Sequence, residues 1–343
     1  MIKIELKSGT YSNTLTEFRK NGKSFIRKET SLSSKDLIKE IEYLLNLPTD
    51  IKEYFPEVIK SNVSKLPVFY DMPFYRYTSL RSNLINNILD AEQTLQIIEK
   101  IAKFTFHKLY TKNKSNADED ILDRLHFNRI YKRLTTIHKK SKIFNRIVKA
   151  DAISVNGEII PNILVNLSVL TQNKNFRKFM NPNYTSMIHG DFHFDNIIVN
   201  SDSSGFILLD PRGELRSYDW TYDYGKLWSS FNGRYDLIHE NLFDIETDLN
   251  NEIPKFVFNF KEHKSILDYD DIKRKIAGIV EPFIHEYGDF RDWLLRVKFV
   301  EAFHFCALAP FHLENDRKEK RAMAKYITGA KLLHASIREY LDT

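Results

Sequence analysis

The hydrophobic pattern of this chain changes its period near residue 79, and this change most constrains what the chain can fold into. Before that point, residues 14–19 and 24–28 have the character of strands. They flank Asn21-Gly22, a dipeptide that tolerates positive φ at both central positions of a two-residue hairpin turn. After residue 79, apolar residues recur at helical spacing, most clearly over residues 323–340. The pattern predicts an α+β chain, with a small β-rich lobe followed by a larger, mainly helical lobe.

The first lobe contains one predicted helix and two further predicted strands. A capping box formed by Ser33 and Asp36 predicts the start of the helix, which ends before Pro48. The apolar positions of this helix are Leu37, Ile41, Leu44 and Leu45. The strands cover residues 57–63 and 67–72, and the segment after them has the character of a connector. We therefore expect a division into residues 1–76 and residues 77–343.

The composition excludes several classes of protein. The 343 residues include 25 Phe and 17 Tyr, more buriable aromatic surface than a disordered chain carries. The longest apolar stretch, residues 299–313, is interrupted by a Glu, a Pro and two His, so we expect no membrane-spanning segment. The first ten residues lack a hydrophobic signal region. The single cysteine, Cys306, cannot form an intrachain disulfide, and we expect it to be a buried core residue in a reducing compartment, the cytoplasm.

Charge is unevenly distributed along the chain, although the net charge is only +5. Residues 124–149 are rich in Lys and Arg, whereas residues 236–252 carry six acidic residues and no Lys or Arg. We interpret both segments as helix faces exposed to solvent, and a balance so close to neutral does not indicate nucleic acid as a partner. Nucleic-acid binding through residues 124–149 is one alternative, and it predicts an affinity that falls steeply with salt.

One β segment inside the helical lobe brings together groups that can carry out chemistry. Residues 196–200 and 206–209 are predicted strands joined by a turn, and Asp210 follows the second strand. The resulting hairpin places Asn196 and Asp210 close together, and Asp191 lies five residues before Asn196. Two carboxylates and an amide oxygen then converge. This is the set of hard oxygen ligands and base that Mg²⁺-dependent phosphoryl transfer requires.

The same residues resemble a known catalytic loop. His189-Gly190-Asp191 with Asn196 matches the H-x-D-x-x-x-x-N loop of protein-kinase-like enzymes, and its HGD form resembles the aminoglycoside phosphotransferase and choline kinase family. The Asp210-Pro-Arg-Gly sequence and residues 222–236 and 309–313 resemble a bacterial branch of that family associated with capsule and surface-polysaccharide biosynthesis. The resemblance implies a protein-kinase-like bilobal fold, in which a small N-terminal β-sheet lobe with one helix precedes a larger, mainly helical C-terminal lobe. It also implies an enzyme that transfers the γ-phosphate of ATP, or another nucleoside triphosphate, with Mg²⁺.

The resemblance also implies roles for individual residues. Asp191 would orient the acceptor hydroxyl and take its proton, and Asn196 and Asp210 would hold Mg²⁺. Lys28 would neutralise the α and β phosphates, and Glu40, on the first helix, would pair with Lys28. Structural support of the catalytic loop would come from His189 and from Asp223 of the Trp220-Thr221-Tyr222-Asp223 segment.

The nucleotide-binding side departs from the protein-kinase pattern, because no G-x-G-x-x-G loop precedes the lysine. Backbone amides and hydroxyls of a short turn would cap the phosphates instead. The candidates in that turn are Gly9, Thr10, Ser12 and Asn13. Adenine is expected against the connector near Tyr70 and Met72.

The acceptor is expected to be a small-molecule alcohol. The branch resemblance favours a sugar, a small polyol or an amino alcohol used in surface-glycan biosynthesis, and the alternative is an aminoglycoside or choline/ethanolamine-type substrate. Residues 236–252 would attract cationic aminoglycosides, and aromatic side chains would surround a choline-like cation. The candidate substrate-binding residues are His193, Asp195, Arg212, Trp220 and Trp228.

Two other interpretations apply to the same residues. His and Asp alternate from His189 to Asp195, as in binuclear metal hydrolases, but such sites need further His ligands with supporting motifs, which the sequence lacks. A nucleotide-binding pseudokinase acting as an interaction module is the second interpretation. The presence of Asp191, Asn196 and Asp210 argues against it.

Overall fold

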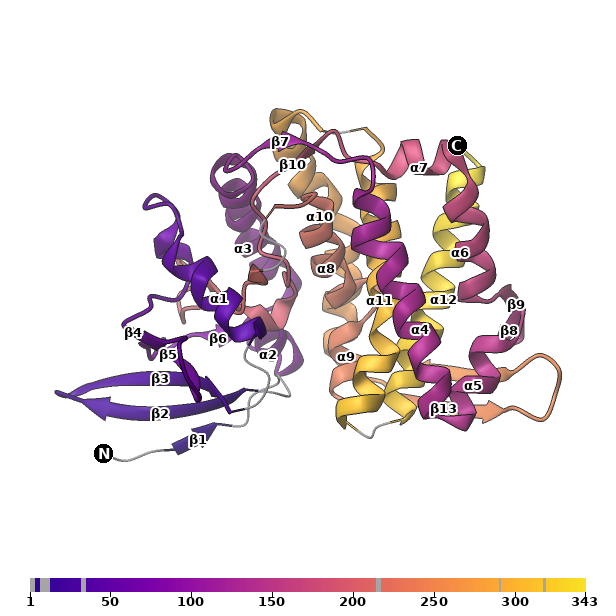
Figure 1. The fold of residues 1–343 in the computed structure, drawn as a ribbon, viewed down its shortest axis with the longest axis horizontal. Coiled ribbons are helices and arrows are strands. Elements are labelled where there is room, and N and C mark those ends of the chain that lie inside the picture. The colour runs from indigo at the N-terminus through magenta and orange to yellow at the C-terminus, as the bar shows by residue number, and fades with distance from the viewer. Residues whose placement is uncertain (1–3, 7–12, 32–34, 214–216, 290, 317–318) are drawn as a thin grey trace.

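A sheet-containing lobe built by the start of the chain lies beside a larger lobe of helices (Figure 1). The computed structural model describes residues 4–6, 13–31, 35–213, 217–289, 291–316 and 319–343. None of the helices within these ranges is both long enough and apolar enough to cross a membrane.

The first lobe is built on a five-stranded antiparallel sheet. Its strands follow the order β1 (Ile4–Leu6), β2 (Thr14–Lys20), β3 (Lys23–Thr30), β5 (Val68–Pro73) and β4 (Lys60–Asn62). The turn between β2 and β3 has φ of 49° at Asn21 and 73° at Gly22, which confirms the predicted Asn-Gly hairpin. The strands predicted over residues 57–63 and 67–72 correspond to β4 and β5.

Among the described residues of this lobe, the α-helix is α1 (Lys35–Leu45), and a short 3-10 helix follows at Lys52–Tyr54. Leu37, Ile41 and Leu44 are buried, as their spacing predicts, but Leu45 is 51% exposed, so its assignment to the apolar face was wrong. Successive residues of a helix are about 100° apart, so the side chain next to Leu44 points towards solvent. The predicted capping residue Ser33 lies outside the described residues.

The second lobe begins with α2 (Leu80–Ile85) and α3 (Ala91–Phe104). Its other helices are α4 (Asn128–Lys140), α5 (Lys142–Lys149), α6 (Ile163–Gln172), α7 (Lys174–Met180), α8 (Thr221–Phe231), α9 (Tyr235–His239), α10 (Ser265–Tyr287), α11 (Trp293–Asp316) and α12 (Glu319–Leu341). α8 and α11 approach each other closely at Gly225, where a Cβ atom would lie 2.5 Å from Cγ1 of Val300. Any side chain larger than hydrogen at residue 225 would therefore push the two helices apart.

The helical lobe also contains a four-stranded sheet, of which strands β13 and β14 were not predicted. It consists of β13 (Phe243–Asp248), β14 (Lys255–Phe260), β8 (Ala152–Val155) and β9 (Glu158–Pro161), in that order. The acidic segment 236–252 therefore forms α9 and β13, which corrects our assignment of it to a helix face. β13 buries Phe243 and Ile245 and exposes Asp244 and Glu246, the two-residue period of a half-buried strand.

A third, three-stranded sheet lies between the lobes and carries the predicted catalytic hairpin. β11 (Ile197–Val199) is its central strand, and β12 (Phe206–Leu208) and β6 (Thr78–Ser79) lie on either side. One cluster of buried apolar side chains runs from Ile26 in the first lobe to Val297 in α11. Because this core crosses the expected boundary, the division at residue 76 stays a prediction.

Burial of Glu301 on α11 predicts that the protein becomes less stable as the pH rises. The Glu301 side chain is fully buried and accepts a 2.7 Å hydrogen bond from Nδ2 of Asn232, and burial raises its pKa to about 8. Between pH 6 and pH 8 the folded state then binds a proton that the unfolded state has lost, so the free energy of unfolding falls with rising pH.

We expect Glu301→Gln to reduce this fall by about 2 kcal/mol, measured by urea unfolding at pH 6 and pH 8. Glu246→Gln, on the exposed face of β13, is the matched control and should leave the pH dependence unchanged. Equal pH slopes for the wild type and Glu301→Gln would contradict the assignment.

Candidate active site

The β11–β12 hairpin brings Asn196 and Asp210 to the same end of the small sheet, as the sequence predicts. Ile197 pairs with Leu208, and the amide of Leu209 donates a 2.8 Å hydrogen bond to the carbonyl of Asn196. Asp210 follows with φ of 58°, a left-handed conformation that Asp adopts more readily than most residues. The backbone therefore turns sharply at Asp210.

Asp223 holds the loop that precedes this hairpin. Its two carboxylate oxygens accept hydrogen bonds from the amides of His189 and Gly190 at 2.8 and 2.7 Å, and Oδ2 also accepts one from the Tyr110 hydroxyl at 3.1 Å. Gly190 has φ of +84°, a conformation that favours glycine. His189 is buried, and its Nδ1 accepts a 3.2 Å hydrogen bond from the amide of Asp191. Asp223 and His189 thus both hydrogen-bond to the backbone of the loop, as the predicted role in supporting the loop requires.

Lys28 on β3 joins the two lobes. Its Nζ lies 2.9 and 2.8 Å from the two carboxylate oxygens of Glu40 on α1 and 2.9 Å from Oδ1 of Asp210. Burial lowers the pKa of Lys28, but the charges of Asp210 and Glu40 outweigh burial and raise it above its ordinary value. The ammonium group is therefore fixed, charged and 2% exposed at the junction of the lobes.

Asp191 lies on the same loop and faces two cations, Lys226 and Arg212, and the ring of His193. Lys226 Nζ is 3.0 Å from Oδ1, His193 Nε2 is 3.8 Å from the same oxygen, and Arg212 Nη1 is 4.0 Å from Oδ2. Burial raises the pKa of Asp191, but the charges of Lys226, His193 and Arg212 outweigh burial and hold it well below its usual range. An ionised carboxylate at this position can accept a hydrogen bond from an alcohol.

Asn196 and Asp210 form a donor set that suits Mg²⁺. Nδ2 of Asn196 donates a 2.8 Å hydrogen bond to the carbonyl of Asp191, which leaves the amide oxygen on the opposite side. Oδ1 of Asp210 contacts Lys28, and the carboxylate has a second oxygen. One amide oxygen and one carboxylate fit a hard cation whose remaining ligands are water and phosphate oxygens. Among the described residues, there is no group of three or more His, Cys, Asp or Glu side chains that could hold a metal ion.

The predicted substrate-binding residues have different environments. His193 and Arg212 face Asp191, whereas Asp195 accepts hydrogen bonds from Arg81 at 2.7 Å and from Ser79 at 3.2 Å. Asp195 therefore ties the loop to the start of α2.

Trp220 and Trp228 lie in the core rather than at the site. Trp220 is 1% exposed and donates a 3.1 Å hydrogen bond to Asp289, and Trp228 packs against Phe231 and Trp293. This burial corrects the expectation that the two rings contact substrate, because an apolar ring that completes a core is not available to a ligand.

Some of the residues predicted to bind the nucleotide lie within the described parts of the chain and others lie outside them. Gly9, Thr10 and Ser12 lie outside the described residues, and Asn13 directly precedes β2. Tyr70 is buried and donates a 2.8 Å hydrogen bond to Oε1 of Glu40, so its side chain positions the partner of Lys28. Met72 is also buried.

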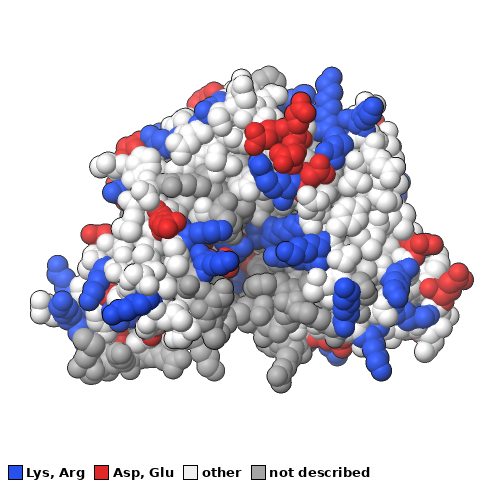
Figure 2. All heavy atoms as spheres, in the orientation of Figure 1, with Lys and Arg blue, Asp and Glu red and all other residues white. Residues whose placement is uncertain are grey.

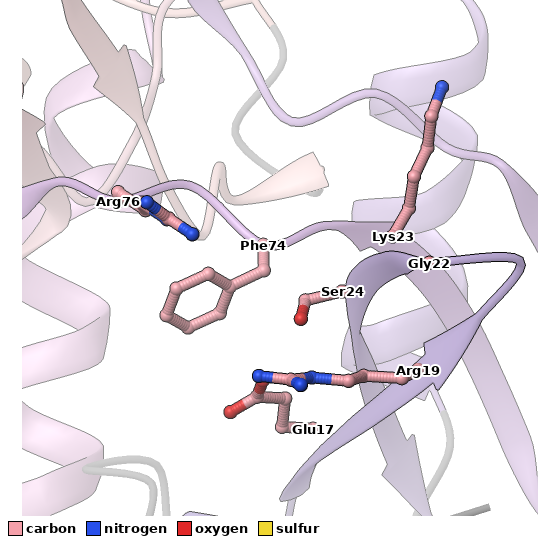
Figure 3. A pocket seen from close by; sticks show the side chains of 7 residues that line it. All are labelled: Glu17, Arg19, Gly22, Lys23, Ser24, Phe74 and Arg76. Atoms are coloured by element: carbon pink, nitrogen blue, oxygen red, sulfur yellow. The ribbon is translucent and has the colours of Figure 1, made fainter.

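A cavity of ≈ 510 Å³ opens on the Lys28 face of the first sheet, at the end farther from Asp210 (Figure 3). It is lined by Glu17, Arg19, Gly22, Lys23, Ser24, Phe74 and Arg76. Ser24 and Lys28 share a face of β3 because strand side chains alternate, and four residues separate them by about 13 Å. The cavity therefore lies on the same face of the sheet as Lys28 and is lined at its other side by Phe74, at the start of the connector after β5.

Two residues at the site were missed in the sequence. Lys226 lies on α8, three residues after Asp223, and this spacing places both side chains on one face of a helix. That spacing could have indicated Lys226. Tyr110 is contributed by the turn that follows α3, and no local pattern connects it with Asp223.

Comparisons with known proteins identify the fold. No protein-family model and no curated protein sequence matches this chain. Among solved structures, it is similar to choline kinase LicA from Streptococcus pneumoniae, at 12% identity and a TM-score of 0.54 over 98% of this chain and 94% of that one. The apo form of a thermostable mutant of aminoglycoside phosphotransferase APH(4)-Ia gives 10% identity and a TM-score of 0.58 over the same shares. Choline kinase from Cryptosporidium parvum gives 12% and 0.52, over 99% and 90%.

The chain therefore has the bilobal, protein-kinase-like fold of choline kinases and aminoglycoside phosphotransferases, which confirms the predicted fold class. The similarity extends over nearly the whole length of both partners. At these identities it establishes the fold, and the function must be argued from the site.

Proposed function

We propose that this protein is a phosphotransferase that moves the γ-phosphate of ATP, or of another nucleoside triphosphate, to a hydroxyl group of a small molecule. The observation that carries the proposal is the position of Lys28, which contacts Glu40 in one lobe and Asp210 in the other. A fixed ammonium beside a metal-binding carboxylate is the arrangement that positions a triphosphate in this fold.

Each group at the site has a role in this reaction. The acceptor oxygen forms a bond to the γ-phosphorus, the bond from that phosphorus to the β–γ bridging oxygen breaks, and the hydroxyl proton passes to Asp191. Mg²⁺, held by Asn196 and Asp210, would neutralise charge on the β and γ phosphates. Lys28 binds the α and β phosphates, and Asp223 keeps Asp191 in position through the backbone of the loop.

The nucleotide is expected to extend from Lys28 to the cavity beside Phe74. Two related structures support a nucleotide donor, since one holds LicA with AMP and another holds APH(4)-Ia with AMP-PNP and hygromycin B. The base would then contact the connector after β5, while the Tyr70 hydroxyl donates its hydrogen bond to Glu40.

The acceptor is a sugar, a small polyol or an amino alcohol of surface-glycan biosynthesis, on the strength of the branch resemblance around Asp210 and residues 222–236. Aminoglycoside and choline/ethanolamine-type acceptors are the alternatives, as for the proteins of similar fold. We place the reaction in the cytoplasm, where ATP is available.

A screen of acceptor alcohols tests the proposed function. We expect ATP consumption to rise with the true acceptor, the phosphorylated product to appear by mass spectrometry, and both signals to disappear when EDTA removes Mg²⁺. ATP binding without Mg²⁺-dependent transfer to any alcohol would contradict the proposal and favour a pseudokinase. DNA or RNA binding that weakens steeply with salt would favour the nucleic-acid alternative.

A further inference from the structure

Lys226 on α8 is a cation with unused hydrogen-bond donors beside the reacting atoms. Its ammonium nitrogen lies 3.0 Å from Oδ1 of Asp191, and its side chain is 12% exposed. An ammonium group has three N–H donors and no acceptor. Within the described parts of the chain, the Asp191 carboxylate is the one acceptor within hydrogen-bond distance of this ammonium, so two of its donors point elsewhere.

The ammonium of Lys28 differs in this respect. It contacts the two carboxylate oxygens of Glu40 at 2.9 and 2.8 Å and Oδ1 of Asp210 at 2.9 Å, so each of its three donors has an acceptor. Of the two lysines at the site, Lys226 is therefore the one whose donors are available to a ligand.

The position of Lys226 places these donors near the path of the phosphoryl group. The acceptor hydroxyl must lie within about 2.6–3.2 Å of Asp191 to pass its proton to the carboxylate. The γ-phosphorus must in turn approach the acceptor oxygen to about 3–3.5 Å. Resting on the proposed function, we propose that Lys226 is a catalytic residue, which donates hydrogen bonds to the γ-phosphoryl group while that group passes from the nucleotide to the acceptor.

Support of Asp191 as a base does not explain this lysine. A cation beside a carboxylate favours the ionised form and so weakens its affinity for a proton, which opposes transfer of the hydroxyl proton to Asp191. The transferring phosphoryl group, in contrast, spreads negative charge over three equatorial oxygens. A cation aimed at that charge lowers the barrier. The benefit of Lys226 then lies in its contact with the phosphoryl group.

The backbone of Lys226 is fixed before any ligand binds. Its carbonyl accepts a 2.6 Å hydrogen bond from Oγ of Ser229. The preceding residue, Gly225, packs so closely on α11 that a Cβ atom would lie 2.5 Å from Cγ1 of Val300. A cation held in place in this way needs no reorganisation at the moment of reaction.

Other positive charges lie on the outer surface. The face of the molecule drawn in Figure 2 is hollowed between the lobes, and Lys and Arg side chains lie on both sides of the hollow. Such a distribution attracts an anionic nucleotide from solution. Lys226 is 12% exposed, so its charge acts on a group that is already bound.

Lys226 stays protonated throughout the step. The acceptor oxygen forms its bond to the γ-phosphorus, the bond to the β–γ bridging oxygen breaks, and the electron pair of that bond stays on the nucleoside diphosphate. The hydroxyl proton passes to Asp191. Lys226 donates hydrogen bonds to oxygens of the moving group and exchanges no proton with it.

A mimic of the transferring group tests the proposal without knowledge of the acceptor. Aluminium fluoride binds with Mg²⁺ and ADP in the place of the γ-phosphoryl group, and ADP affinity is measured calorimetrically with Mg²⁺, with and without aluminium fluoride. We expect aluminium fluoride to tighten ADP binding to the wild type. Lys226→Met should weaken binding of ADP with aluminium fluoride by about tenfold or more and leave binding of ADP alone unchanged. Lys226→Arg, which keeps the charge, should retain part of the affinity.

Lys298→Met is the matched control. Lys298 on α11 pairs with Glu339 at 2.7 Å, so this variant also removes a lysine from an ion pair, but away from Asp191. It should bind ADP as the wild type does, with and without aluminium fluoride. Lys226→Gln should behave like Lys226→Met, which separates the loss of charge from the introduction of an apolar group. The affinity for ADP alone reports correct folding of each variant.

The Asp191→Asn background separates contact with the phosphoryl group from positioning of Asp191. If Lys226 contacts the phosphoryl group, Lys226→Met weakens binding of the mimic in this background as well. The inference is overturned if that loss disappears in the Asp191→Asn background, because Lys226 would then act through Asp191.

Three further results would also overturn the inference. They are an absence of any gain from aluminium fluoride in the wild type, wild-type affinity for the mimic in Lys226→Met, and an equal loss with and without aluminium fluoride in that variant. Failure of the wild type to bind ADP with Mg²⁺ would instead reject the proposed function, and the inference with it.

Discussion

Asp191→Asn is expected to lower kcat for phosphate transfer by about 10²–10⁴-fold, with little change in nucleotide affinity. The carboxylate is the one ionised acceptor on the catalytic loop beside Lys226 and Arg212, and an amide cannot take the hydroxyl proton. The loop itself should persist, because Asp223 holds it through the amides of His189 and Gly190. Single-turnover measurement of phosphorylated product checks the result.

Asp202→Asn is the control for this substitution. Asp202 lies on the exposed turn of the same hairpin and bonds to Ser204, so the variant removes an equal charge away from the reacting atoms. Transfer to the true acceptor at nearly the wild-type rate in Asp191→Asn would show that another group takes the proton.

Lys28→Met should lower both activity and stability. Removal of the ammonium takes away the group proposed to bind the α and β phosphates, and we expect kcat/KM to fall about 10²–10³-fold. It also leaves the carboxylate of Glu40, which is 6% exposed, without its cation. Breaking one half of a buried ion pair costs about 3–5 kcal/mol in the free energy of unfolding, measured by urea denaturation.

The double variant Lys28→Met with Glu40→Gln separates these two effects. Its neutral amide can still accept the hydrogen bond from Tyr70, so we expect most of the lost stability to return while transfer stays low. Recovery of activity together with stability would mean that Lys28 acts only on the fold.

The sequence predicted correctly those turns, hairpins and helix faces whose conformation depends on residues close together in the chain. The Asn21-Gly22 turn, the hairpin before Asp210 and the apolar face of α12 each depend on a few neighbouring residues. Strands β13 and β14 were missed, although Phe243 and Ile245 alternate with acidic residues. Residues 236–252 were assigned to a helix face because they carry six acidic residues, and the two-residue period of the apolar positions was not considered.

The candidate site shows the same limit. Asp191, Asn196 and Asp210 lie within 20 residues, so motif spacing was enough to place them together. Lys28 meets Asp210 across 182 positions, and resemblance to a family was needed to pair them. Trp220 and Trp228 were misjudged because α8 is buried on nearly all sides, and nearness in sequence to Asp223 does not reveal this.

The close approach of α8 and α11 at Gly225 has a consequence for how this protein can change its substrate. α8 carries Asp223, which accepts hydrogen bonds from the amides of His189 and Gly190, and also Lys226, which pairs with Asp191. α8 packs closely against Val300 at Gly225, and Asp223 of the same helix holds the loop of residues 189–191. A shift of α8 to admit a different acceptor would therefore move this loop as well. New acceptor preferences are therefore expected to arise by exchange of side chains on a stationary helix.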